Sequence, residues 1–323
     1  MTGEAGNGPD PRLVTRGSVP PSQISLLGHA PGLLSSESIS EARFDWYAAT
    51  VRVNSALVLK QLAESLRVEL RELSKGLNGY TNQVELRRDG EVIGKVLYGG
   101  NGGSPHVFAS GSNADELAHV LRELWPDHHG VSRCDVAIDF DGPGTWDRLE
   151  AFARNFAAEQ GVKTSVYGDW ITPGSPDGRT LYLGSRKSAV FLRIYEKGKQ
   201  LRGLAIGSGQ DPEGFSEDLV RVEIQVRPEK DSRQIAAQMD PVAAYGFSRW
   251  SQTFASDLFG LDLERVSIKH VRDSDDDRAL AFMRRQYGAV LERVVLEQFD
   301  GSWEAFGASL GGQLVGQRRS SVA

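Results

Sequence analysis

Hydrophobic and polar positions divide the chain into strand-like and helix-like segments that follow a long start without periodicity. Residues 1–40 are rich in Gly, Pro and Ser and show no period, so we expect a mobile tail there. Residues 43–51 read as a strand, and leucines then recur at steps of three and four, which is typical of an amphipathic helix. That series comprises Leu59, Leu62, Leu66, Leu70 and Leu73, and glycines at 76 and 79 are expected to close the helix.

A β-hairpin is predicted around Asp89-Gly90, which separates two strand-like segments at residues 84–88 and 92–98. Asp-Gly suits the two positive-φ positions of a type I′ turn. A further short strand is expected at residues 106–110. Asn113 is followed three residues later by Glu116, which predicts a capping box at the start of a helix. This helix would bury Leu117, Val120, Leu121 and Leu124.

The rest of the sheet is predicted from a second series of segments in the same order. A strand at residues 131–140 and a helix at 146–159 come first. Further strands are expected at 163–167, 179–183, 189–196 and 219–226, with a glycine-rich loop at 203–214 before the last of them. The repeated order is compatible with a diverged duplication. The predicted fold class is therefore α+β, dominated by antiparallel sheet, with helices from residue 234 onward and an acidic break at 273–277.

The pattern predicts three regions: an N-terminal tail (1–40), an α+β region (41–260) with halves at about 41–130 and 131–260, and a helical C-terminal region (261–323). No apolar run approaches the length of about 18 residues expected of a membrane-spanning helix. The first residues lack the features of a signal peptide, and Cys134 is the only cysteine, which excludes an internal disulfide. We therefore expect a cytoplasmic protein with no membrane partner.

Charge is unevenly distributed along the chain. The net charge of -6 disfavours a uniformly basic surface. Residues 179–199 nevertheless contain six basic residues and a single acid, Glu196. This local excess indicates an anion site.

Three of the predicted strands each place polar side chains on one face, because alternate residues of a strand point the same way. The three sets are Arg133, Asp135 and Asp139; Arg193, Tyr195 and Lys197; and Arg221, Glu223 and Gln225. If the strands are neighbours, they form a carboxylate site beside a tyrosine, and oxygen ligands suit Mg²⁺ or Mn²⁺. The alternative is that each set is only the solvated face of an amphipathic sheet.

Motifs in this region resemble a known family. Leu181-Tyr-Leu-Gly-Ser-Arg-Lys-Ser188 and Leu192-Arg-Ile-Tyr-Glu-Lys197 are preceded by Arg-x-Asp-x-Ala-x-Asp at 133–139 and followed by Arg-Val-Glu-Ile-Gln at 221–225. Together they resemble the replication initiation factor family of rolling-circle plasmids and filamentous phages, over about residues 44–228. The resemblance suggests a relation to the fold of nucleases with a His-hydrophobe-His metal motif. This sequence contains no His-x-His, so carboxylates are expected to take that role.

The resemblance implies an enzyme that nicks one DNA strand at an origin and later rejoins it. By motif match Tyr195 is the nucleophile, which leaves a 5′-phosphotyrosine and a free 3′-OH. Arg193 and Lys197 are expected to favour the phenolate and hold phosphate oxygens. Mg²⁺ or Mn²⁺ would be the cofactor, held by Asp135, Asp139 and Glu223, with Asp139 and Glu223 preferred.

The turn after residue 183 is the predicted DNA grip. Its small residues and two cations, Ser185, Arg186, Lys187 and Ser188, suit contacts to a DNA backbone, and Arg221 is expected to contribute to them. The implied partners are origin DNA, both double-stranded and unpaired, with a host helicase, a DNA polymerase and a second copy of the chain as further candidates.

Several alternatives remain open. Tyr182 is a rival nucleophile, although its neighbours carry no charge. His119-x-x-Arg122 matches a recombinase motif and is interpreted as chance, and His128-His129 as an exposed loop pair. Trp46 and Tyr47 are interpreted as core aromatics in preference to base-stacking residues. The rival functions are a relaxase or transposition protein of a mobile element and a non-catalytic regulator that binds the origin.

Overall fold

A computed structural model of the chain describes residues 38–172, 175–266 and 275–320. Most of the predicted N-terminal tail therefore lies outside the described residues. The strands are β1 (Ser38–Ile39), β2 (Arg43–Val51), β3 (Glu69–Leu73), β4 (Tyr80–Arg88), β5 (Glu91–Gly100), β6 (His106–Ser110), β7 (His129–Asp141), β8 (Thr164–Tyr167), β9 (Thr180–Leu183), β10 (Val190–Tyr195) and β11 (Val220–Val226). The α-helices are α1 (Ser55–Leu66), α2 (Asn113–Leu124), α3 (Thr145–Gln160), α4 (Lys197–Gly207), α5 (Ser232–Gln238), α6 (Arg249–Phe259), α7 (Asp275–Gln298) and α8 (Trp303–Ser320). Two short 3₁₀ helices complete the set, η1 (Pro212–Gly214) and η2 (Pro241–Phe247).

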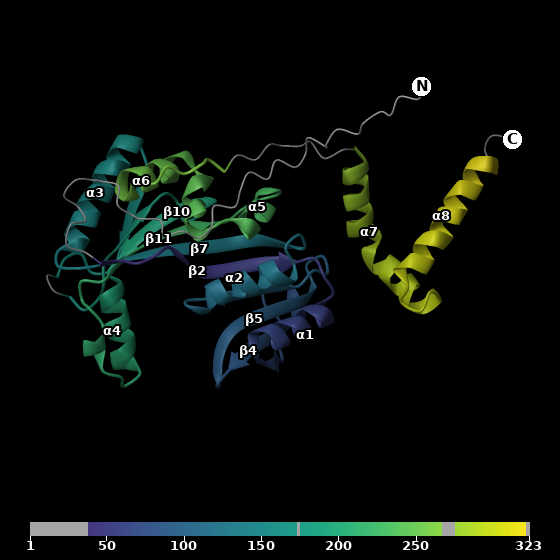
Figure 1. Cartoon of the computed structure of the whole chain (residues 1–323), viewed down its shortest axis with the longest axis horizontal. Coiled ribbons are helices and arrows are strands. Elements are labelled where there is room, and N and C mark those ends of the chain that lie inside the picture. Colours follow the sequence, from purple (N-terminus) through teal and green to yellow (C-terminus); the bar gives the residue numbers. More distant parts are fainter. Residues whose placement is uncertain (1–37, 173–174, 267–274, 321–323) are drawn as a thin grey trace, which may run out of the picture.

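All strands belong to one 11-stranded sheet, whose pairs are antiparallel (Figure 1). The order is β3-β4-β5-β6-β2-β7-β11-β10-β9-β8, with β1 added beside β7. The order reads outward from the central pair β2–β7 in the same way on both sides. Each half starts in the centre, crosses to the edge after a helix and returns strand by strand, so the order expected of a duplication is present in the topology. The predicted α+β class is confirmed.

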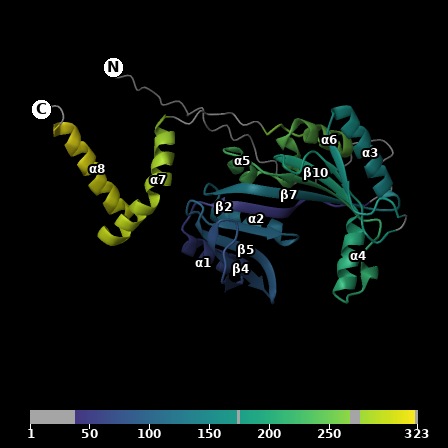
Figure 2. The same cartoon turned by 180° about the vertical axis from the view of Figure 1, so that it is seen from behind.

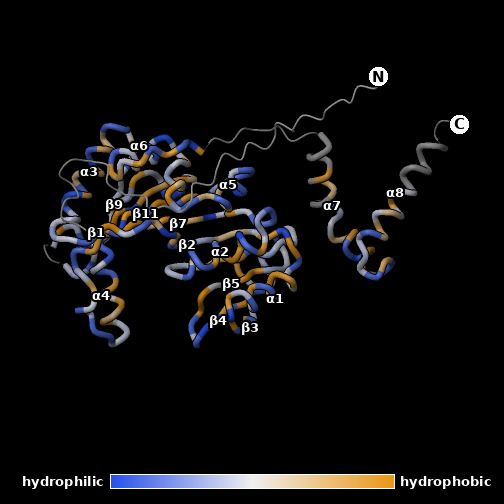
Figure 3. Tube along the Cα trace, in the orientation of Figure 1, coloured by the Kyte–Doolittle hydropathy of each residue, from blue (hydrophilic) through white to orange (hydrophobic). Residues whose placement is uncertain are grey.

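The hydrophobic core lies between one face of this sheet and its helices. Phe44 and Tyr47 of β2, Cys134 and Val136 of β7 and Ile224 of β11 point into it and are at most 1% exposed. Figure 3 shows the corresponding concentration of apolar residues along the central strands. Seen from behind in Figure 2, α2 lies along the first half of the sheet, and α3 and α6 lie along the second. The opposite face carries the polar side chains described below.

The predicted hairpin and the strands around it are confirmed. Asp89 and Gly90 both have positive φ, 52° and 86°, as a type I′ turn requires. They join β4 to β5, in which Val84 lies opposite Val96.

The leucine series was a partly wrong prediction. Helix α1 ends at Leu66, where Arg67 takes the left-handed conformation with φ 52°. Leu70 and Leu73 instead belong to β3, and Leu70 pairs with Leu86 of β4. A spacing of three or four residues cannot distinguish a helix from a helix that is followed by a short edge strand.

Three further local predictions are corrected. Asn113 is the first residue of α2 and Ser112 its N-cap, without a side-chain cap, because Glu116 binds Arg88 instead of closing a capping box. The predicted loop at 203–214 begins inside α4. The part of the acidic break that is described, from Asp275, belongs to α7.

The chain beyond α6 continues to contact the core. Leu261 is 8% exposed, Gln252 donates a hydrogen bond to the Leu263 carbonyl, and the Val266 amide donates to the Gly246 carbonyl. Residues 261–266 are therefore attached to the α+β region, which extends a few residues beyond the expected boundary at 260. Helices α7 and α8 follow and meet at an angle (Figure 1). In the described part of the chain, no helix is long and apolar enough to span a membrane.

Candidate active site

The open face of the second half of the sheet brings the three predicted polar sets together, because β7, β11 and β10 are adjacent. In the register of these strands Tyr195 lies opposite Arg221, which in turn lies opposite Asp139. One row further, Arg193 lies opposite Glu223. The strand-alternation argument is therefore correct for the residues within the strands.

Tyr195 ends β10 and is 9% exposed. Its hydroxyl donates a hydrogen bond to Glu223 Oε2 at 3.1 Å. Burial raises the pKa of this hydroxyl, and the charge of Glu223 raises it further, while Arg221 and Arg193 act in the opposite direction. The neighbouring cations do not outweigh burial, so the resting side chain is a neutral phenol that already points at a carboxylate.

Glu223 is the most enclosed carboxylate of the site, with a side chain 1% exposed. Besides the bond from Tyr195 it accepts one from Arg193 through Oε1. Burial raises the pKa of Glu223 to about 7, Arg193 opposes this, and the charges of Asp135 and Asp45 add to the increase. The group therefore titrates near neutral pH, where a proton acceptor is most effective.

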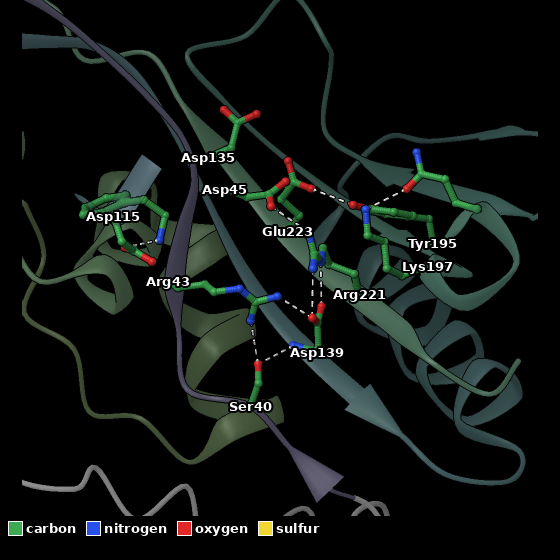
Figure 4. A network of polar contacts seen from close by, with 12 residues as sticks. Ser40, Arg43, Asp45, Asp115, Asp135, Asp139, Tyr195, Lys197, Arg221 and Glu223 are labelled. Atoms are coloured by element: carbon green, nitrogen blue, oxygen red, sulfur yellow. Dashed lines mark hydrogen bonds and ion pairs between the residues drawn. The ribbon is translucent and has the colours of Figure 1, made fainter. Parts of the chain in front are cut away.

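Asp139 is held by arginines and not by the tyrosine (Figure 4). Arg221 donates to both of its oxygens, at 2.6 and 2.9 Å, and Arg43 donates to Oδ2. Burial opposes ionisation, but these arginines lower the pKa of Asp139 on balance. Ser40 binds the backbone amide of Asp139 and accepts a bond from Arg43, which fixes the start of the described chain against β7.

Asp135 has an equally defined partner. Arg133, two residues away on the same face, donates to both of its oxygens at 2.9 and 2.6 Å, and Arg193 lies 4.0 Å from it. Its side chain is 2% exposed, whereas that of Arg133 is 33% exposed. The carboxylate thus anchors an arginine that remains accessible at the surface of the sheet.

Lys197 and Arg221 differ from their expected settings. Lys197 is the first residue of α4 and not part of the strand; its Nζ donates to Gln200 and lies 5.8 Å from the centre of the Tyr195 ring. Burial and the charge of Arg221 lower its pKa. Arg221 is 8% exposed in its side chain and enclosed by Asp139 and Asp45, so it does not offer the exposed DNA contact that the sequence predicts.

The predicted DNA-binding turn is exposed, in contrast to Arg221. Ser185, Arg186, Lys187 and Ser188 are all solvent-exposed between β9 and β10. Arg227 donates hydrogen bonds to the Arg186 and Ser188 carbonyls and so stabilises the backbone of the turn. The turn lies at the opposite end of β10 from Tyr195, about 17 Å away by the rise of a strand.

The carboxylates predicted as metal ligands are not gathered as a set. In the described ranges there is no group of three or more His, Cys, Asp or Glu side chains placed to hold a metal ion. Asp135 and Asp139 each have both oxygens bonded to arginine. Mg²⁺ often takes only one or two carboxylates and completes its shell with substrate phosphate and water. Glu223 and Asp45 fit this pattern better, because each is bonded to a single arginine and their like charges oppose each other.

Asp45 is the residue that sequence reasoning missed. Its Oδ1 accepts a bond from Arg221 at 2.7 Å, and its charge acts on both Glu223 and Tyr195. Figure 4 shows its carboxylate directed toward Glu223. Counted from Phe44, alternation places Asp45 on the open face, but counted back from Tyr47 it places Asp45 in the core, because the register of β2 against β7 shifts between Phe44 and Trp46. Such a bulge reorients a side chain and leaves no signal in the alternation.

The structure also places the alternative candidates. Tyr182 lies opposite Arg193, and its ring is beneath Arg186 at 5.3 Å, without a carboxylate partner among the contacts of the described chain. His119 is 74% exposed in its side chain, on α2. His129 is not an exposed loop residue: it is fully buried in β7, bonded to Tyr47 and to the Trp125 carbonyl. Tyr47 is a core residue as predicted, whereas Trp46 lies on the open face, which corrects the prediction for that side chain.

The fold and the site define an α+β protein in which one open sheet face presents a tyrosine within an arginine–carboxylate network. Residues 129–295, just over half of the chain, match the family described as replication initiation factor. The chain belongs to that family. A similar solved structure is that of a rolling circle replication initiator protein from Geobacillus stearothermophilus, with 20% identity over 71% of this chain and 99% of that one, and a TM-score of 0.47. No curated protein matches the sequence.

Proposed function

We propose that this protein initiates rolling-circle replication by nicking one strand of an origin through Tyr195 and later rejoining it. The observation that carries the proposal is the bond from the Tyr195 hydroxyl to Glu223 on an open, arginine-lined sheet face. Family membership and the motif at residues 181–197 support the same reaction. The intact tyrosine–carboxylate pair argues against the non-catalytic regulator.

In the proposed reaction Tyr195 Oη attacks the phosphorus of the scissile phosphodiester. The hydroxyl proton passes to Glu223 Oε2, which already accepts it as a hydrogen bond. The bond from phosphorus to the 3′-oxygen breaks, and that oxygen takes up a proton from water to give a free 3′-OH. The 5′-phosphate remains on the tyrosine. Rejoining is the reverse, with a 3′-OH as nucleophile and the tyrosine oxygen as leaving group.

The arginines supply the positive charge that this transfer needs. Arg193 lies 5.4 Å over the Tyr195 ring, and its side chain is one-third exposed, so it is within reach of both the phenol and a phosphate. Lys197 Nζ lies 5.8 Å from the centre of the same ring. Fixed cations beside a phosphate stabilise the charge that develops on its oxygens. We assign Arg193 and Lys197 to that task.

A divalent ion would be held by the carboxylates of Asp45 and Glu223 together with a DNA phosphate. When bound, Mg²⁺ or Mn²⁺ would polarise the scissile phosphate. It would also relieve the repulsion between the two carboxylates, which burial makes costly. Asp139 and Asp135 would then keep Arg221 and Arg133 in position.

The first prediction concerns the nucleophile. Tyr195→Phe removes only the attacking oxygen, so covalent protein–DNA adducts on a single-stranded origin oligonucleotide should fall below detection. The dissociation constant for the same DNA should stay within about twofold of the parent, since no phosphate contact is lost. Adducts are measured on denaturing gels with 5′- and 3′-labelled DNA.

Tyr182→Phe is the matched control, because it removes the rival hydroxyl from the adjacent strand. This variant should form adducts at the parental rate. Adducts that persist in Tyr195→Phe and disappear in Tyr182→Phe would transfer the role to Tyr182. Adducts absent from the parent protein on every origin strand tested would contradict the proposed function.

A further inference from the structure

Four aromatic side chains form a continuous row on the open face of the first half of the sheet. We call Trp46, Phe108, His106 and Tyr80 the aromatic row. The Trp46 and Phe108 rings are stacked, with centres 5.4 Å apart and planes at 14°. Phe108 and His106 follow at 6.1 Å, and His106 stacks on Tyr80 at 6.1 Å and 19°. The members of the row come from β2, β6 and β4, and β5 lies between the last two in the sheet.

The row is not part of the hydrophobic core. Tyr47 and Val107, next to Trp46 and Phe108 in the chain, point to the other face and are fully buried. All four rings of the row are partly exposed. A continuous run of partly exposed aromatic side chains is typical of a binding surface.

Cations lie at both ends of the row. Arg133 covers the Trp46 ring at 4.6 Å and is one-third exposed. At the other end the charge of Arg233, an exposed residue, acts on both Tyr80 and His106. Burial and Arg233 together lower the pKa of His106, so its ring is neutral at pH 7 and stacks as an aromatic. Aromatic rings that are flanked by cations suit unpaired DNA, because the rings can contact bases and the cations can contact phosphates.

The row leads to the candidate active site through direct contacts. Arg133 binds Asp135, Arg193 lies between Asp135 and Glu223, and Glu223 accepts the Tyr195 hydroxyl bond. Strand spacing and rise put Trp46 about 20 Å from Tyr195 along this diagonal. That distance corresponds to about six stacked nucleotides of one DNA strand.

We propose that the aromatic row is a binding subsite for unpaired bases of the origin strand, about six nucleotides from the scissile phosphate. This inference rests on the proposed function, because it deepens the account of the DNA that the same face binds. The bases of a duplex are already stacked on one another, whereas unpaired bases are free to stack on these rings. The subsite therefore selects single-stranded over paired DNA.

The test uses the full-length Tyr195→Phe protein, in which no covalent step disturbs binding. Fluorescence anisotropy measures its affinity for a labelled oligothymidylate strand of about 20 nucleotides and for a duplex of the same length. Trp46→Ala with Phe108→Ala should weaken binding to the single strand by about tenfold or more, because two rings on which bases stack are removed. Duplex affinity should be unchanged, and Trp46→Phe should retain most of the single-strand affinity.

Tyr167→Ala is the control, because Tyr167 is a 72% exposed aromatic on the edge strand β8, away from the row. It should leave both affinities at the parental values. Near-UV circular dichroism and thermal melting verify that each variant is folded. Unchanged single-strand affinity in the double alanine variant would overturn the proposal, as would an equal loss for duplex and single strand.

The two hypotheses fail in different ways. The subsite proposal fails if the binding experiment, which involves no nicking, shows unchanged single-strand affinity in the double alanine variant. The proposed function fails if the protein with Tyr195 intact forms no covalent adducts with DNA. As a positional check, 5-iodouracil placed at successive nucleotides should crosslink to Trp46 or Phe108 most strongly at about six nucleotides from the nick, and crosslinking only next to the nick would contradict the placement.

Discussion

Each functional side chain on the open face is defined by its partner as much as by its position. Arg221 joins Asp139 to Asp45, and Arg193 joins Glu223 to Asp135. Removing one member of such a buried pair leaves an uncompensated charge, which commonly costs about 3–5 kcal/mol. Loss of activity in an Arg221 variant would therefore reflect altered positions of the two carboxylates and not a lost contact to DNA.

Alternation within a strand identified the face shared by Tyr195 and Glu223, because the period of two is fixed by backbone geometry. It did not identify which carboxylates pair with arginine, since pairing depends on the register between strands. It also missed Asp45, because the β2 bulge makes alternation ambiguous there: it places the side chain on the open face when counted from Phe44 and in the core when counted back from Tyr47. The pairing of carboxylates with arginines and the position of Asp45 both depend on contacts between strands, which a local pattern does not contain.

Asp45 and Glu223 are assigned to the metal ion, whereas Asp135 and Asp139 hold arginines, and this difference gives a prediction about metal use. Nicking should be lost in excess EDTA and restored by Mg²⁺ or Mn²⁺. Asp45→Asn should raise the metal concentration for half-maximal nicking by about tenfold, because a neutral amide is a weaker ligand than a carboxylate. The measurement is the nicking rate at increasing metal concentration.

Asp139→Asn is the matched variant, since it changes the same group in the same network but at a carboxylate held by Arg221 and Arg43. It should leave the metal dependence unchanged and lower the stability of the fold. The reverse result, with Asp139 setting the metal requirement and Asp45 having no influence, would favour the ligand set expected from the sequence. Full activity in EDTA would exclude a metal role for either residue.

At the scale of elements, the sequence was most informative where turn chemistry is specific. Asp89-Gly90 predicted its hairpin because few residue pairs adopt two consecutive positive φ angles. The leucine series was misread because Leu70 and Leu73 fit a helical spacing, whereas a left-handed Arg67 ends the helix and pairing with β4 turns the next residues into a strand. Pairing with a distant strand overrode the local period.

The turn between β9 and β10 provides a prediction at this scale. Arg186→Ala with Lys187→Ala should weaken DNA binding and reduce the slope of log affinity against log salt by up to about 1.8 for a duplex. The backbone of the turn should keep its shape, since Arg227 holds it through main-chain carbonyls. Anisotropy titrations at several salt concentrations give the slope.

Lys60→Ala with Lys75→Ala removes the same charge from two exposed positions of the first half and serves as the control. This pair should leave the slope near the parental value. A turn variant with an unchanged salt slope would mean that these cations do not contact phosphates.

At the scale of the whole molecule, the repeated topology explains why a site forms beside the centre of the sheet. Both halves start with a central strand, so β2 and β7 bring residues more than eighty positions apart into contact, as in the bond from Arg43 to Asp139. The order of elements predicted this repetition. The meeting of the halves at β2–β7 could not be predicted, because nothing in the local pattern specifies which strands of each half become neighbours.

The limits of the α+β unit can be tested by truncation. A chain that ends at residue 266 keeps the buried Leu261, the Gln252 bond to the Leu263 carbonyl and the Val266 bond to Gly246. We expect it to fold with the parental unfolding free energy and to form Tyr195 adducts, because none of the site contacts described above involves α7 or α8. A chain that ends at 260 loses a buried leucine and three hydrogen bonds, the third from the Leu261 amide to the Ala255 carbonyl, and should be less stable by about 3–5 kcal/mol. Urea denaturation measures the unfolding free energy of the two truncated chains.

The family match extends to residue 295 and so includes most of α7. If the chain that ends at 266 is stable but forms no adducts, α7 is part of the catalytic unit.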